Sequence, residues 1–311
     1  FTTVCCMPNT MPVIDTPDKV RYVLEKAENA CGVRVLQSAA ITVGQRGKEL
    51  TDFASLKKAG AAAVSEDGHS VADIKLMREA LRTAAGLGIP VLDHTEQPEL
   101  RDAGSVHRGA AAGLTGIPGI PEQAEEAIAI RDMLLAQETG GAVHLQHIST
   151  SGSLDLIRFA KKRGINVTAE TAPHYFTLTD EDIIAGGGNK EIYHRCLSPK
   201  GVTVDTHRKM NPPLRSSADR QAVIEALMDG TLDAIATDHA PHSAEEKSRD
   251  FLKAPFGVIG LETSFAVSKT VLVDENGMTP SRLIELMSVK PAEILGCGGG
   301  TLAPGCRADI A

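Results

Sequence analysis

Residues 142–171, AVHLQHISTSGSLDLIRFAKKRGINVTAET, contain two short β-like runs separated by a helical pattern. The runs cover residues 142–148 and 165–171, and both are apolar enough to be buried strands. Two parallel strands must be joined by a crossover, which is usually a helix, so a strand, a helix and a strand in this order indicate a parallel sheet. This stretch therefore predicts an α/β fold.

The same alternation of strand-like and helical patterns extends along most of the chain. Thr16, Pro17 and Asp18 offer an N-cap, a proline at the first helical position and an acidic first turn. Ile74 begins a second helical pattern, and Pro121 with the acidic residues after it begins a third. The predicted strands are residues 1–7, 33–41, 60–66, 89–94, 142–148, 165–171 and 232–238.

A closed barrel of this type has eight strands, whereas seven are predicted here. Because the first predicted strand begins at residue 1, we expect one strand to lie upstream. The predicted fold is a (β/α)8 TIM-type barrel whose first strand is missing, formed by residues 1–296, with residues 297–311 as the beginning of a truncated C-terminal β-domain. Such a barrel has two unpaired edges, so we expect residues 1–311 alone to be inactive or to aggregate.

Composition limits the kinds of partner that the chain can have. Forty acidic against 32 basic residues give a net charge of −8, which opposes an extended nucleic-acid surface. No apolar run approaches the roughly 20 residues that span a bilayer, so no membrane association is expected. The six cysteines form no CxxC pair and are expected to be reduced thiols of a cytoplasmic protein. A small-molecule partner is favoured.

Four polar residues stand where predicted strands end. Asp67, His94, His147 and Asp238 follow four different apolar runs. Catalytic groups of parallel barrels gather at this carboxyl-terminal rim. Taken singly, a buried histidine is commonly a hydrogen-bonded core residue and a strand-end aspartate a helix cap. Two imidazoles and two carboxylates on one rim instead suit zinc, either one ion or a pair bridged by a carboxylate.

Seven motifs in order resemble those of the class I dihydroorotases, which are zinc-dependent cyclic amidohydrolases. The resemblance covers essentially the whole chain, and the order of the motifs makes it specific. The motifs are Met7-Pro8-Asn9-Thr10, Ser65-Glu66-Asp67-Gly68, Asp93-His94-Thr95-Glu96, Gln146-His147-Ile148-Ser149-Thr150, Met210-Asn211-Pro212-Pro213-Leu214-Arg215, Thr237-Asp238-His239-Ala240-Pro241-His242 and Pro255-Phe256-Gly257.

The resemblance implies one or two zinc ions held by Asp67 as the bridging group, by His94 and His147, and by Asp238. The family's His-x-His pair and its carboxylate-binding arginine have no counterpart here, which agrees with the expected upstream strand. Related hydantoinases and allantoinases use a carbamylated lysine as the bridge. An aspartate at this position favours dihydroorotate as the substrate.

The resemblance also implies a reaction and a set of substrate contacts. Water opens the dihydroorotate ring to N-carbamoyl-L-aspartate, and pyrimidine biosynthesis runs the reverse direction. The metals would polarise the carbonyl group and generate hydroxide, while Asp238 would move the proton as base and then acid. Asn9 and His242 would bind the substrate carboxylate. The amide edge of the ring would be read by Asn211, Phe256 and Gly257.

Other interpretations remain open at this point. One is a hydantoinase-like or allantoinase-like amidohydrolase, and another is a non-catalytic subunit that scaffolds aspartate carbamoyltransferase. For the active enzyme we expect a homodimer that can associate with that transferase. His174 and His239 are interpreted as structural residues, and Glu96 either supports His94 or is exposed at the surface.

Overall fold

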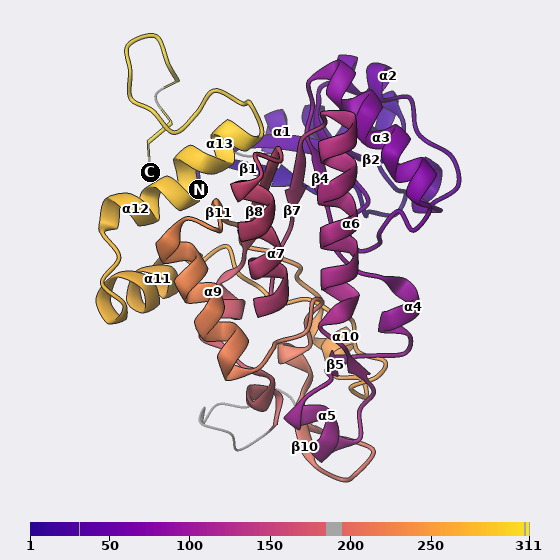
Figure 1. Ribbon diagram of the computed structural model, residues 1–311, viewed down its shortest axis with the longest axis vertical. Coiled ribbons are helices and arrows are strands. Elements are labelled where there is room, and N and C mark those ends of the chain that lie inside the picture. The colour runs from indigo at the N-terminus through magenta and orange to yellow at the C-terminus, as the bar shows by residue number, and fades with distance from the viewer. Residues whose placement is uncertain (31, 185–194, 308, 311) are drawn as a thin grey trace.

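Seven parallel strands form a single curled sheet in this computed structural model, which describes residues 1–30, 32–184, 195–307 and 309–310 (Figure 1). Neighbouring strands follow the order β1-β2-β3-β4-β7-β8-β11, so each sheet strand pairs with the next sheet strand along the chain. Within the described residues β1 and β11 are the two edges. The strands are β1 (Thr3–Cys6), β2 (Arg34–Ala40), β3 (Ala61–Ser65), β4 (Val91–Asp93), β7 (Val143–Leu145), β8 (Val167–Thr171) and β11 (Ala234–Ile235).

All seven predicted strands are confirmed, each within the range that the sequence indicates. Between them lie helices and two small sheets, β5 (Val106–His107) with β6 (Gly119–Ile120) and β9 (Arg195–Leu197) with β10 (Thr203–Asp205). The α-helices are α1 (Pro17–Ala30), α2 (Phe53–Lys58), α3 (Ile74–Leu87), α4 (Pro98–Arg101), α5 (Ala110–Thr115), α6 (Gln123–Thr139), α7 (Ser151–Lys162), α8 (Pro173–Thr177), α9 (Ser217–Asp229), α10 (Ala244–Lys247), α11 (Ser264–Ser268), α12 (Pro280–Ile284) and α13 (Lys290–Ile294).

Shorter helical segments connect several of these elements. The 3₁₀ turns are η1 (Val43–Gln45), η2 (Asp180–Ile183) and η3 (Thr206–Arg208), and the π-helical segments are η4 (Lys269–Glu275) and η5 (Glu285–Val289). The segments α12, η5 and α13 follow one another directly and form a continuous helical run. The helix expected to open at Pro121 begins two residues later, at Gln123.

The two faces of the sheet differ in polarity because side chains alternate along a strand. Val64, Val143 and Ile235 belong to the main apolar core, which the packed helices α3, α6, α7 and α9 cover on the outer face (Figure 1). The inner face is polar: the Ser65 hydroxyl donates to the Gln146 side chain at 3.2 Å. The alternation of side chains along each strand therefore directs these polar side chains toward the inside of the curl.

Local capping fixes where the helices that follow the strand ends begin. Asp73 caps α3 by accepting from the backbone N–H groups of Lys75 and Leu76. Thr150 caps α7 by accepting from the Ser153 N–H, three residues after His147. Each such cap satisfies a donor that the helix itself leaves unpaired. The segments between strand and helix are thereby kept short.

The tail after residue 296 is the expected beginning of a C-terminal β-domain. In its described part, residues 297–307 and 309–310, the structure shows turns and irregular chain. Ala308 and Ala311 of this tail lie outside the described residues. The division of the chain at residue 296 stays a prediction. In the described segments no helix combines the length and the apolar character that crossing a membrane requires.

Leu81 of α3 tests the core that holds the helices on the sheet. Its side chain is fully buried in the main apolar cluster, so Leu81→Ala leaves a cavity and should lower the free energy of unfolding by about 2–5 kcal/mol. Leu134 of α6 is 47% exposed, and Leu134→Ala should cost less than about 1 kcal/mol. Denaturant unfolding measures both. Equal losses in the two variants would contradict this description of the core.

Candidate metal centre and active site

Three of the four predicted ligands meet at the rim of the curled sheet. The His94 Nδ1 atom lies 2.9 Å from the His147 Nε2 atom, and the Asp67 Oδ1 atom lies 3.7 Å from each of these nitrogens. One ligand atom from each residue fits within a group whose members lie no more than 4.8 Å apart. They come from the ends of β3, β4 and β7, so the parallel topology brings them together.

A buried polar atom without a partner supports a metal ion at this group. Asp238 Oδ2 is buried, belongs to a residue that lines the cavity beside the group, and has no hydrogen-bond partner among the described residues. Buried polar groups are normally paired, so an unpaired carboxylate oxygen here indicates a group that binds there. Imidazole nitrogens and carboxylate oxygens are the ligands of open zinc sites. The donor set therefore fits the ion that the sequence indicates.

The charges at the centre are strongly coupled. Burial raises the pKa of Asp67, but the interactions with His147 and His94 outweigh it and the net pKa is lowered. Burial lowers the pKa of His147, yet the Asp67 and Asp238 carboxylates raise it to about 9. For Asp238, burial dominates over the attraction of His147 and raises the pKa to about 6. Carboxylates that hold a proton on a buried imidazole would equally favour a cation in its place.

Two of the predicted ligands have a strained backbone. His147 and Asp238 adopt φ angles of 38° and 48°, in the left-handed region that residues other than glycine rarely occupy. Behind His147, the carboxylate of Glu125 accepts from the backbone N–H groups and hydroxyls of Ser149 and Thr150. These bonds hold the turn that follows β7. Strain of about 1–3 kcal/mol at such a residue persists only where the surroundings fix it.

The outer nitrogen of His94 also has neighbours. Glu96 Oε2 lies 3.9 Å from His94 Nε2, and Asn211 Nδ2 lies 3.5 Å from it. Glu96 is buried, so the alternative of plain surface exposure does not hold. A carboxylate beside the nitrogen that does not face the metal is the usual way in which a histidine ligand is oriented.

A cavity of about 320 Å³ opens beside the ligands, large enough for a ring-sized molecule. It gathers every predicted site residue except His242, which contacts its wall from outside by a 2.8 Å hydrogen bond between His242 Nε2 and the Phe256 carbonyl. The predicted residues that line it are Asn9, Asp67, His94, His147, Asn211, Asp238, Phe256 and Gly257.

Several of the residues that line the cavity already form contacts within the protein. Asn9 Nδ2 donates to Asp67 Oδ2 at 2.7 Å, which links the end of β1 to the metal centre. The Gly257 N–H donates to the Lys209 carbonyl at 3.0 Å. A Cβ atom at Gly257 would lie 2.5 Å from the Ala240 carbonyl, so only glycine allows this close approach. The Asn211 Oδ1 atom is buried and free to accept from a ligand.

Two cavity neighbours were not predicted to act at the site. Arg101 of α4 lines the cavity, 3.3 Å from Glu96 and 5.3 Å from the centre of the Phe256 ring. No strand-end pattern marks α4, so the sequence offered no signal for it. His174 Nε2 lies 3.8 Å from Asp238 Oδ2, and burial lowers its pKa to about 3. The Nδ1 atom of His239 accepts the Gly260 N–H, a structural role as expected.

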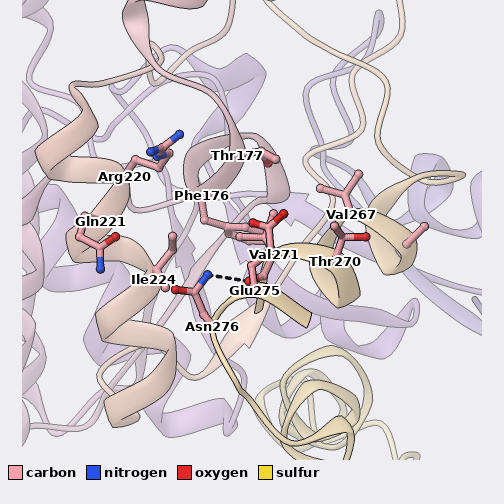
Figure 2. A pocket seen from close by; sticks show the side chains of 11 residues that line it. Phe176, Thr177, Arg220, Gln221, Ile224, Val267, Thr270, Val271, Glu275 and Asn276 are labelled. Atoms are coloured by element: carbon pink, nitrogen blue, oxygen red, sulfur yellow. Dashed lines mark hydrogen bonds between the residues drawn. The ribbon is translucent and has the colours of Figure 1, made fainter. Parts of the chain in front are cut away.

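A second cluster and a second cavity lie elsewhere. His107, Glu122 and Asp219 also meet metal-ligand distances, but both nitrogens of His107 already face carboxylates, Asp180 at 3.2 Å and Glu122 at 3.3 Å. Asp219 forms the capping box of α9. Hydrogen bonds therefore account for this cluster. The other cavity shares no lining residue with the metal centre; Figure 2 shows its walls, formed by α8, α9, α11 and η4.

The family model and the similar proteins of known function agree on one family. A family model described as dihydro-orotase-like matches residues 1–153. The dihydroorotase of Clostridioides difficile (strain 630) is 46% identical over 310 residues, which are 100% of this chain and 69% of that protein. The dihydroorotase of Brevibacillus brevis is 47% identical over 311 residues, with the same coverage of both chains. The chain belongs to the dihydroorotase family.

Solved structures of hydantoinases share the fold. The L-hydantoinase (dihydropyrimidinase) from Arthrobacter aurescens matches with a TM-score of 0.78 and 24% identity, over 99% of this chain and 67% of that one. The dihydropyrimidinase from Brevibacillus agri NCHU1002 matches with a TM-score of 0.78 and 20% identity, over 99% and 66%. The predicted barrel of the amidohydrolase kind is thus confirmed. Membership of the dihydroorotase family makes the protein a cyclic amidohydrolase that acts on a small molecule, and the family implies a metal ion.

His147 provides a test of the metal centre. His147→Asn removes one of the imidazole ligands, and the protein should lose most of its tightly bound metal after dialysis while remaining folded. His207→Asn serves as the control, because its side chain is 39% exposed and lies beside Asp205 outside the cavity. Elemental analysis measures the metal per chain. Full metal content in His147→Asn would contradict the assignment.

Proposed function

We propose that this protein, expressed from its complete reading frame, catalyses the reversible hydrolysis of dihydroorotate to N-carbamoyl-L-aspartate, the dihydroorotase step of pyrimidine biosynthesis. The observation that carries the proposal is the convergence of Asp67, His94, His147 and Asp238 on one cavity in a member of the dihydroorotase family. Asp67 stands where lysine-bridged relatives would place a carbamylated lysine. The geometry thus supports the aspartate-bridged form of the site.

The proposed cofactor is zinc, one or two ions per chain. Asp67 Oδ1, His94 Nδ1 and His147 Nε2 would hold it, with Asp238 as a further ligand. This mixture of imidazole and carboxylate suits zinc, whereas calcium and magnesium prefer oxygen ligands alone. A bound ion would polarise the carbonyl that is attacked and lower the pKa of the attacking water.

Asp238 is the proposed proton carrier. Its carboxylate can accept a proton from the attacking water while the new C–O bond forms. The protonated Asp238 can then return that proton to the ring nitrogen as the C–N bond breaks, so that one group acts as base and acid in turn. A pKa raised to about 6 by burial suits this double role, because both protonation states are accessible near neutral pH.

The remaining cavity residues are proposed to orient the substrate. Asn9 and His242 would contact its carboxylate, while Asn211 and the backbone of Phe256 and Gly257 would contact the amide edge of the ring. The unpaired Asn211 Oδ1 supports this role, because a ring N–H could donate to it. The contact of His242 with the Phe256 carbonyl places both residues on one wall.

Assembly and location are proposed on the family resemblance. We expect a homodimer that can associate with aspartate carbamoyltransferase, in the cytoplasm. None of the five cysteines that the structure describes forms a disulfide with another, which agrees with a reducing compartment; Cys31 lies outside the described residues. Light scattering of the purified protein, alone and mixed with the transferase, measures the mass of each species. A protein that is monomeric and does not bind the transferase would contradict both expectations.

Asp238→Asn tests the proposed chemistry. The protein, expressed from its complete reading frame, is assayed for zinc content and for hydrolysis of dihydroorotate. The amide keeps the shape of Asp238 but cannot take up the proton, so kcat should fall roughly 10²–10⁴-fold. Asp155→Asn is the control, because the Asp155 side chain is 79% exposed on α7. Its activity should match that of the unmodified protein.

The same assays separate the other interpretations. If the unmodified protein opens hydantoin or allantoin but not dihydroorotate, the result would support a hydantoinase-like or allantoinase-like amidohydrolase instead. A folded protein without metal or activity on any of these rings would favour the scaffold subunit. Wild-type activity in Asp238→Asn would remove Asp238 from the mechanism.

The rate should also depend on pH in a defined direction. Hydrolysis needs Asp238 as the carboxylate, so its rate should rise as the pH increases through the pKa of Asp238. That pKa is about 6 in the protein alone, and a bound cation would lower it, so the rise should be complete by about pH 7. Ring closure needs the protonated acid and should slow over the same interval. Initial rates in both directions measure this, and parallel profiles would contradict it.

A further inference from the structure

Two lysines are buried behind one wall of the cavity. Lys209 and Lys247 are only 2% and 4% exposed. Neither forms an ion pair with a carboxylate among the described residues. Burial lowers the pKa of each to about 8. The Asp205 carboxylate opposes this shift at Lys247, but the effect of burial is larger. A buried charge that is not paired directly with a carboxylate is unfavourable, and an apolar residue would serve better if only packing mattered. The ammonium groups therefore call for a specific role.

The Lys209 ammonium is surrounded by backbone carbonyl oxygens of a single loop. It donates to Phe251 at 2.6 Å, to Ala254 at 2.7 Å and to Leu252 at 3.3 Å. Its nitrogen also lies 4.6 Å from the centre of the Phe256 ring, a cation–π distance. One ammonium thus determines the path of residues 251–256.

Lys247 binds the same loop from its other side. It donates to the Pro255 carbonyl at 2.9 Å, to Thr206 at 3.2 Å and to Lys209 at 3.5 Å. Thr206 in return donates through its hydroxyl to the Lys247 carbonyl. The two ammonium groups therefore join residues 205–211 to residues 247–257.

Those two segments both contribute residues to the lining of the cavity. Asn211 stands two residues after Lys209, and Phe256 and Gly257 follow the carbonyls that the lysines bind. The Gly257 N–H donates to the Lys209 carbonyl at 3.0 Å, which closes the connection. The Phe256 ring also lies 5.3 Å from Arg101, so cations contact it from two elements. The position of the backbone at this part of the cavity thus depends on Lys209 and Lys247, two charged residues that do not line the cavity.

We propose that Lys209 and Lys247 are positioning residues that set the distance between Asn211 and the Phe256–Gly257 backbone, and so the fit of the substrate ring between these walls. The ammonium groups bind carbonyls as a structural cation would, and they act on substrate binding rather than on the chemical step. This inference rests on the proposed function of the cavity.

The test replaces each ammonium by an apolar group of similar length. Lys209→Met and Lys247→Met keep the aliphatic stem but lose the charge and three donors. The KM for dihydroorotate should rise roughly 10-fold or more, since hydrogen bonds from charged groups are lost, while kcat changes less than about threefold and zinc content is unchanged. Lys253→Met is the control, because that side chain is 76% exposed in the same loop and should leave KM unaltered.

Neutral donors separate positioning from folding. Lys209→Gln and Lys247→Gln retain N–H groups for the carbonyls, so their KM should lie between those of the unmodified protein and the methionine variants. If the methionine variants unfold, the glutamine variants carry the test alone, and their KM should exceed that of the unmodified protein while kcat and zinc content stay the same. Folded, zinc-loaded variants with unchanged KM would overturn the inference, as would a fall in kcat alone. An unmodified protein that binds zinc but does not act on dihydroorotate would instead reject the proposed function, and with it this role.

Discussion

The site depends on one constraint, that all seven strands of the main sheet run in the same direction. Each strand then ends at the same rim, and the residue after it reaches the same space. Asp67, His94 and His147 are far apart in the sequence, yet their ligand atoms lie within 4.8 Å of one another. An antiparallel strand would carry its final residue to the opposite rim. The chemistry of the site is therefore a consequence of parallel pairing combined with curvature.

Bringing these groups together has an energetic cost that the surrounding structure offsets. His147 and Asp238 occupy left-handed backbone conformations, and the Asp67 and Asp238 carboxylates share a buried region with two imidazoles. Glu125 holds the chain after β7 through four donors, and a bound cation would relieve the charge. Strain and charge are thus concentrated where the reaction is proposed to occur, as is usual for sites that must be preorganised.

The cavity walls follow a different principle from the metal ligands. Ligands come from strand ends, which the sheet holds rigidly. Asn211, Phe256 and Gly257 come instead from long connections that have no sheet to hold them. Buried lysines bind these connections together through backbone carbonyls, while Asn9 is tied to Asp67 by its own amide. Two kinds of support, a hydrogen-bonded sheet and buried ammonium groups that bind backbone carbonyls, thereby meet around one cavity.

The sequence by itself determined the strands, their order and the four candidate ligands at strand ends, because strand and helix patterns and the residue after each strand are local properties. The motifs added Asn9, Asn211 and the Phe256–Gly257 segment. Only the tertiary structure decided the rest: the burial of Glu96, the approach of His174 to Asp238, the place of Arg101 on the cavity wall and the carbonyl contacts of Lys209 and Lys247. These are contacts between segments that are distant in sequence. The residues around a side chain in the sequence do not indicate which distant residue it will contact.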